Sequence, residues 1–160
     1  MADLKAAFEK LGFSDATTVL QSGNVLFTSP RSTEELKPAI ESNLNEVFHY
    51  PAIVQVLPLE KLKAIVSACP FDAFDQEFHA YVIFFENGLE QKLASEATLT
   101  KDIESIQVSD GVLYWQVVRG MTLKSSFAAY LTKQPYKSAH TNRNIRTLYK
   151  VIAAEKAVSS

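Results

Sequence analysis

Residues 104–118 read ESIQVSDGVLYWQVV, two strand-like segments that meet at Asp110-Gly111. Asp-Gly is among the strongest signals for a two-residue hairpin turn, because these residue types tolerate the positive φ angles that the turn requires. The flanking segments carry β-branched and aromatic residues, which favour strands. The stretch therefore predicts an antiparallel hairpin with arms at 104–109 and 112–118.

Strand-like and helix-like patterns alternate on both sides of this hairpin. His79–Glu86 is an apolar strand, Leu89–Ala97 has a helical pattern, and further helices are expected at 123–132 and 142–155. The resulting order, β-α-ββ-α-α, is a ferredoxin-like βαββαβ unit with one element missing or replaced.

The N-terminal part of the chain repeats this alternation. It predicts a helix at 2–11, a hairpin with arms at 17–20 and 25–28, a helix at 32–48 and a strand at 52–57. This order, α-ββ-α-β, lacks only an opening strand to make a βαββαβ unit.

The two patterns together predict an α+β fold of two ferredoxin-like (α/β plait) halves in tandem, the first lacking its opening strand. The first half covers residues 1–58. The second covers residues 59–160, beginning with a linking helix at 59–68 and ending with a basic helix.

Two separated motifs resemble the signatures of a known family. The first is QSGNVLF at residues 21–27, preceded by Leu11-Gly12-Phe13, and the second is Thr-x-Arg-Asn-x-x-Thr-x-x-Lys at residues 141–150. Both are similar to those of an uncharacterised, mostly bacterial family catalogued as domain of unknown function 1697. The resemblance implies two ferredoxin-like halves and carries no established reaction.

Members of that family usually begin with a strand and an Arg-Gly-Ile-Asn segment, whereas this sequence begins at the methionine that follows them. In a βαββαβ unit the first strand lies in the middle of the sheet. We therefore expect residues 24–28 and 52–57 to lack their common neighbour.

The composition is that of an ordinary soluble globular protein, with 47% hydrophobic and 21% charged residues over 160 positions. The longest apolar run, Ala80–Phe85, is far shorter than the roughly 20 residues that span a bilayer. The chain shows no basic-then-apolar leader, and its single cysteine, Cys69, cannot form an intramolecular disulfide. We expect a cytoplasmic protein with no membrane partner.

The charge is distributed unevenly along the chain. Residues 1–118 contain 8 Lys and Arg against 17 Asp and Glu, whereas residues 119–160 contain 8 against 1. Such asymmetry suggests an anionic partner. The alternative is that the basic C-terminal part packs on the acidic remainder and is neutralised internally.

Known catalytic and cofactor motifs are missing. The sequence has no GxxxxGK[ST], GxGxxG, HExxH, GxSxG or EF-hand pattern. Cys69 is expected to be an inert thiol, and the acidic, phenylalanine-rich stretch 71–79 is expected to be a loop rather than a metal site. No cofactor and no metal are expected, and whether the protein is an enzyme stays open.

The C-terminal helix carries the main candidate site. At 100° per residue, Arg143, Arg146 and Lys150 fall on one side and the apolar residues on the other. With Thr141 or Asn142 as the N-cap, Arg143 lies in the first turn, where the helix dipole disfavours a cation by about 0.3–1 kcal/mol.

An anion should compensate this charge. It is either a carboxylate from residues 72–77 or a ligand phosphate held by Arg143 together with Lys137 or His140. The candidate anion-binding residues are Arg143, Arg146, Lys150, Thr141, Asn144 and Lys137. The turn residues Gln21, Ser22 and Asn24 are secondary candidates, although hairpin geometry already explains Gly23 and Asn24.

Three classes of function remain. The favoured one is a non-catalytic binding domain for nucleic acid or a phosphorylated ligand, with Tyr136 and Tyr149 available for stacking. The second is a small-molecule enzyme or sensor with Arg143 and Arg146 as a clamp. The third is an assembly module in which strand edges pair between chains and form a homo-oligomer.

Overall fold

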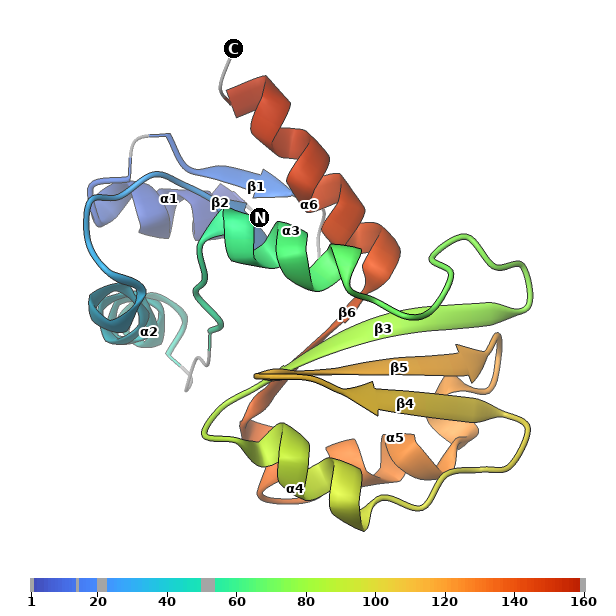
Figure 1. Cartoon of the computed structure of the whole chain (residues 1–160). Helices are drawn as coiled ribbons and strands as arrows, with labels where there is room; N and C mark the ends of the chain where they lie inside the picture. Colours follow the sequence, from blue (N-terminus) through green and yellow to red (C-terminus); the bar gives the residue numbers. More distant parts are fainter. Residues whose placement is uncertain (1, 14, 20–22, 50–53, 159–160) are drawn as a thin grey trace. The chain divides into compact units, whose positions relative to one another are not determined.

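The computed structural model describes residues 2–13, 15–19, 23–49 and 54–158 (Figure 1). The chain divides into two compact units. The first comprises residues 1–65 and 147–160, and the second comprises residues 66–146. The protein is a mixed α+β structure with one two-stranded and one four-stranded sheet among the described residues.

The second unit is built on the four-stranded sheet. Its strands and α-helices follow in the order β3 Phe78–Phe85, α4 Leu89–Glu96, β4 Glu104–Val108, β5 Val112–Val118, α5 Ser126–Leu131 and β6 His140–Asn144. Short 3₁₀ helices, η1 Thr122–Lys124 and η2 Tyr136–Ser138, flank α5. The strand order is β4-β5-β3-β6, and all neighbouring strands are antiparallel.

The hairpin predicted at 104–118 is confirmed. Glu104 pairs with Val117 and Val108 pairs with Leu113, so β4 and β5 are joined across the predicted Asp110-Gly111 turn. Gly111 has a φ of 80°, the left-handed conformation in which a glycine is favoured.

The helix predicted at 142–155 is wrong at its start. Residues 140–144 form β6, which pairs with β3 from Tyr81↔Asn144 to Phe85↔His140, and the helix α6 runs over Ile145–Val158. The edge of buried β3 that faces away from β5 must have hydrogen-bonding partners, and β6 supplies them. The element that the sequence pattern left missing or replaced is therefore a strand.

One face of the four-stranded sheet forms the core of this unit. Ile83 and Phe85 of β3 lie with Trp115 of β5 in a buried cluster that α4 and α5 cover (Figure 1). The carboxylate of Glu104, which is only 7% exposed, lies in this core. It accepts hydrogen bonds from Trp115 Nε1 at 2.9 Å and from the backbone N–H groups of Thr100 at 2.8 Å and Phe127 at 3.2 Å.

The first unit contains the two-stranded sheet and most of the remaining helices. Its elements are α1 Ala2–Lys10, β1 Thr17–Val19, β2 Asn24–Leu26 and α2 Thr33–Phe48, with α3 Leu59–Ser67 and α6 crossing into the second unit. Phe8 and Phe13 pack with Ile40 and Leu44 of α2 in its core. Ser32 is the N-cap of α2, and its side chain accepts the Glu35 N–H at 3.3 Å.

The strand predicted at 52–57 is not formed in its described part. Residues 52 and 53 lie outside the described residues, and residues 54–57 belong to no strand. The backbone groups of Val54 instead form hydrogen bonds with side chains of α2. Its N–H donates to Glu41 Oε2 at 3.2 Å, and its carbonyl accepts from Lys37 Nζ. The two strands expected to flank a vacancy are therefore not both present among the described residues: residues 24–26 form β2, paired with β1 as the predicted hairpin requires, and residues 54–57 form no strand.

None of the helices in the described part of the chain has the length and apolar character needed to cross a membrane.

Candidate functional site

The predicted anion-binding residues lie along β6 and its two ends rather than in one pocket. Lys137 is in η2 before the strand, and Arg146 is in the first turn of α6 after it. A strand of five residues spans about 17 Å. The strand therefore separates Lys137 from Arg146, and Lys150 lies one helical turn further along α6.

The residues of β6 itself are divided between the two faces of the sheet. Thr141 and Arg143 alternate with Asn142 and Asn144, and directly paired residues share a face. Because Asn142 pairs with Ile83, the two asparagines lie on the face covered by α4 and α5, and Thr141 and Arg143 lie on the opposite face.

Arg143 is a half-buried strand residue. Its Nη1 donates to the Asn142 carbonyl at 3.0 Å, and burial lowers the pKa of the guanidinium. The expectation that a helix dipole demands an anion beside Arg143 is wrong, because Arg143 precedes the helix. Asn144, not Thr141 or Asn142, caps α6: its Oδ1 accepts the Arg146 N–H at 2.9 Å.

Two arginines hold the loop that precedes β3. Arg146 Nε donates to the Ala73 carbonyl at 2.8 Å, and its guanidinium lies 5.6 Å from the centre of the Phe74 ring. Arg119 Nη2 donates to the Asp75 carbonyl at 2.8 Å. Both arginines thus bind backbone oxygens. Arg119 was not among the predicted site residues, although it was a signal that no Asp or Glu occurs in the sequence from Arg119 to Ala154.

The carboxylates of this loop have a different role. Asp72 Oδ1 accepts the Phe74 N–H at 2.8 Å, and Asp75 Oδ1 accepts the N–H groups of Glu77 at 2.7 Å and Phe78 at 3.1 Å. These bonds fold the loop through local turns. They support the prediction that the acidic, phenylalanine-rich stretch is a structural loop.

His79 lies beside the two arginines. Burial lowers the pKa of its imidazole below the usual value, and the positive charges of Arg119 and Arg146 lower it further. The side chain is consequently neutral at pH 7 and adds no positive charge to this part of the molecule.

The cations of the basic segment, which we define as residues 119–150, form fewer ion pairs than the Lys and Arg residues at 1–118, five of which are paired. In the acidic part, ion pairs join Lys5 to Glu9, Arg31 to Glu35, Lys37 to Glu41, Lys63 to Glu60 and Glu155, and Lys92 to Glu96. Within the part of the chain that the structure describes, no ion pair to a carboxylate is formed by Arg119, Lys124, Lys133, Lys137, Arg146 or Lys150. Lys133 instead lies 5.9 Å from the centre of the Tyr130 ring.

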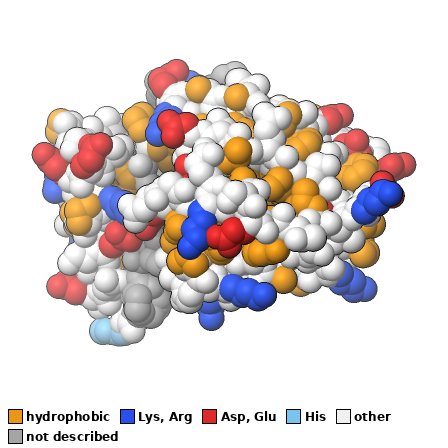
Figure 2. All heavy atoms as spheres, turned by 60° about the horizontal axis from the view of Figure 1, so that its bottom comes forward, with side chains coloured by type: hydrophobic (Ala, Val, Ile, Leu, Met, Phe, Trp, Pro, Cys, Tyr) orange, Lys and Arg blue, Asp and Glu red, His pale blue; other side chains and the backbone are white. Residues whose placement is uncertain are grey.

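The two tyrosines proposed for stacking have different environments. Tyr136 is 3% exposed and packs edge-on against Phe85, with 6.5 Å between ring centres, so its predicted role in stacking is wrong. Tyr149 of α6 is 42% exposed. On the face shown in Figure 2, Lys and Arg side chains are spread singly rather than gathered in one patch.

The secondary candidates belong to the first hairpin. Asn24 Nδ2 donates to the Val19 carbonyl at 3.1 Å and so ties the two strands together. Gly23 has a φ of 83°, as a tight turn requires. Gln21 and Ser22 lie outside the described residues.

Cys69 is half-buried, and its Sγ lies 3.7 Å from the Phe71 carbonyl that it donates to. Burial raises the pKa of the thiol, which opposes formation of a reactive thiolate. Among the described residues, no group of three or more His, Cys, Asp or Glu side chains is arranged to hold a metal ion.

The fold and these residues define a small α+β protein with a basic C-terminal segment. The chain matches the family described as protein of unknown function DUF1697 over residues 1–114, more than half its length, and it belongs to this family. The resemblance seen in the sequence is thereby confirmed. The match ends before the second motif, at residues 141–150.

The chain is also similar to the structure of a conserved bacterial protein from Streptococcus pneumoniae. The TM-score is 0.75 and the sequence identity 25%, and the alignment covers 96% of this chain and 87% of the other. No curated protein matches the chain significantly. Neither description names an activity, a ligand or a partner.

Proposed function

We propose that this protein is a non-catalytic binding domain for an anionic partner, which it recognises through the basic segment. The observation that carries the proposal is the contrast in ion pairing. Five of the eight Lys and Arg residues at 1–118 pair with a glutamate, whereas none of the cations at Arg119, Lys124, Lys133, Lys137, Arg146 and Lys150 does so among the described residues.

An anion supplied from outside would neutralise these charges. The sequence contains no carboxylate from Arg119 to Ala154, so the segment has no acidic neighbour in sequence either. Lys124, Lys133 and Lys137 are exposed, and each presents an ammonium group that attracts phosphate as a point charge.

The distribution of the cations favours an extended polyanion over a small phosphorylated ligand. A small-ligand site gathers a few polar groups in one concave pocket. Here the cations follow one another from η1 to α6, and β6 separates Lys137 from Arg146. Single-stranded nucleic acid has the matching chemistry, a flexible chain of phosphates whose binding is driven by counterion release.

A binding assay tests this proposal. Fluorescence anisotropy of a labelled 20-nucleotide single-stranded oligonucleotide would be compared between the parent and the triple variant Lys124→Gln, Lys133→Gln, Lys137→Gln. The matched control replaces Lys61, Lys92 and Lys101, which are exposed outside the basic segment. We expect the first variant to weaken binding at least tenfold more than the control. Equal weakening by both, or no binding by the parent, contradicts the proposal.

The arginine-clamp alternative makes a different prediction. It requires Arg143 and Arg146 to converge on one small anion, yet Arg146 is engaged by the Ala73 carbonyl and the Phe74 ring. Saturable thermal stabilisation by inorganic phosphate or a mononucleotide, with no affinity for the oligonucleotide, would favour the clamp.

We also infer that the second unit is ferredoxin-like. Its element order, β3-α4-β4-β5-α5-β6, and its strand order, β4-β5-β3-β6, support this inference. A tandem of two such halves, divided at residues 58 and 59, stays a prediction.

A further inference from the structure

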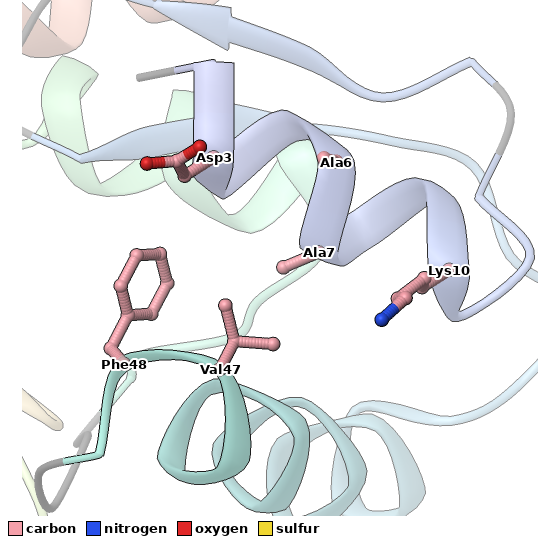
Figure 3. Close-up of a pocket in the computed structure, with 6 residues that line it drawn as sticks. All are labelled: Asp3, Ala6, Ala7, Lys10, Val47 and Phe48. Atoms are coloured by element: carbon pink, nitrogen blue, oxygen red, sulfur yellow. The ribbon is translucent and has the colours of Figure 1, made fainter.

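A groove lies between the first two helices of the first unit (Figure 3). It encloses about 390 Å³ and is lined by Asp3, Ala6, Ala7, Lys10, Val47 and Phe48. Asn43 Nδ2 of α2 donates to the Ala7 carbonyl of α1 at 3.0 Å and so joins the two walls. Val47 and Phe48 also pack against the buried core of this unit.

The groove is apolar in the middle and charged at both ends. Asp3 and Lys10 lie seven residues apart, which is about 10 Å along a helix. Figure 3 shows both side chains beside the groove, Asp3 near Phe48 and Lys10 at the other end of α1. Among the described residues neither forms an ion pair, whereas Lys5 and Glu9 of the same helix pair with each other.

This arrangement of charges is complementary to itself. If a second α1 runs antiparallel to the first about a two-fold axis between Ala6 and Ala7, Asp3 of each helix faces Lys10 of the other. The exposed Ala6 of each copy then lies near the centre, where its small side chain permits the helix axes to approach to about 8 Å, while Ala7, which is 2% exposed, stays packed in the core of its own copy. An isologous contact requires such self-complementarity.

We propose that this groove is a homodimer interface in which α1 of one copy docks antiparallel on α1 of another, over Val47 and Phe48 of α2. A second copy satisfies both end charges at once and aligns the two helix dipoles favourably. One short helix pair buries less than the roughly 1,200 Å² of a standard interface, so the dimer is weak. It rests on residues far in sequence from the basic segment and is independent of the proposed function.

Charge-swapped variants test the pairing directly. Asp3→Lys places two cations at the contact and Lys10→Asp places two anions there, so neither variant should pair with itself. An equimolar mixture restores both ion pairs and should associate. Sedimentation equilibrium between about 10 µM and about 1 mM, a range suited to weak interfaces, would measure the mass. The parent and the mixture should rise from 17.8 kDa toward twice that value, and each single variant should not.

Both swaps also oppose the helix dipole, so a variant independent of it is needed. Ala6→Arg keeps a good helix former at an exposed position and should abolish association of the parent, whereas Lys5→Gln on another side of α1 should not. A parent that stays monomeric, a single swap that associates like the parent, or a mixture that does not associate overturns the proposal. Should a swap fail to fold, unchanged association of Ala6→Arg overturns it.

Discussion

Replacing Glu104 by glutamine should destabilise the second unit strongly. The buried carboxylate is the acceptor for three donors: Trp115 Nε1 on one oxygen, and the backbone N–H groups of Thr100 and Phe127 on the other. A glutamine side chain has one acceptor oxygen and one donor NH₂ group. Whichever way the amide is oriented, at least one buried donor then faces another donor.

The magnitude follows from the number of groups left without a partner. One buried unsatisfied donor costs about 1–3 kcal/mol. In the less costly orientation the amide oxygen serves the two backbone groups, and only the indole N–H of Trp115 loses its acceptor. Since a neutral amide is also easier to bury than a carboxylate, we expect a net loss of about 2 kcal/mol.

Trp115 provides the assay, because it is the only tryptophan and is 1% exposed in the core of the same unit. Urea unfolding followed by its fluorescence would be compared for the parent, Glu104→Gln and the control Glu46→Gln, which changes an exposed glutamate of α2. The control should lie within about 0.5 kcal/mol of the parent. A Glu104→Gln variant that is equally close would refute the assigned role of the carboxylate.

Three further predictions concern other parts of the chain. Ser32→Ala removes the acceptor for the Glu35 N–H at the start of α2 and should cost about 1 kcal/mol in the free energy of unfolding, measured by circular dichroism; no loss would show that the cap is not needed. Arg143→Ala should lower the free energy of unfolding in urea by about 1–2 kcal/mol, and Lys137→Ala should lower it by less than about 0.5 kcal/mol. The reason is that Arg143 is half-buried and bonded to the Asn142 carbonyl whereas Lys137 is exposed, and equal losses would count against this difference. Because the pKa of His79 is lowered on folding, the unfolded chain binds the proton more readily, and the free energy of unfolding should fall as the pH drops below about 6.5. His79→Gln should flatten that part of the stability profile, and a profile that the variant leaves unchanged would contradict this assignment.

The features predicted well from the sequence are those that local chemistry determines. The Asp110-Gly111 turn joins β4 and β5 as predicted, and the helix predicted at 32–48 is α2, which begins directly after its N-cap, Ser32. In both places the signal lies within a few residues of the structure that it specifies.

The features that the sequence did not predict depend on partners far along the chain. The polar sequence of residues 140–144 lacks the apolar alternation of a strand and becomes one because β3 must be paired on both sides. The Val54 backbone is bonded by Lys37 and Glu41 rather than by a strand, and Arg119 and Arg146 bind loop carbonyls rather than carboxylates. Charge counting finds the cations but does not identify the atoms that they contact.

The salt dependence of oligonucleotide binding tests the central claim most directly. For single-stranded nucleic acid, log K falls with log salt concentration by about 0.7 for each phosphate contacted. If the basic segment binds the phosphates, replacing Lys124, Lys133 and Lys137 together should make this slope shallower by about 2, while the control at Lys61, Lys92 and Lys101 should leave it unchanged. A parent affinity that does not depend on salt, or a slope that the first triple replacement leaves unaltered, would contradict the account.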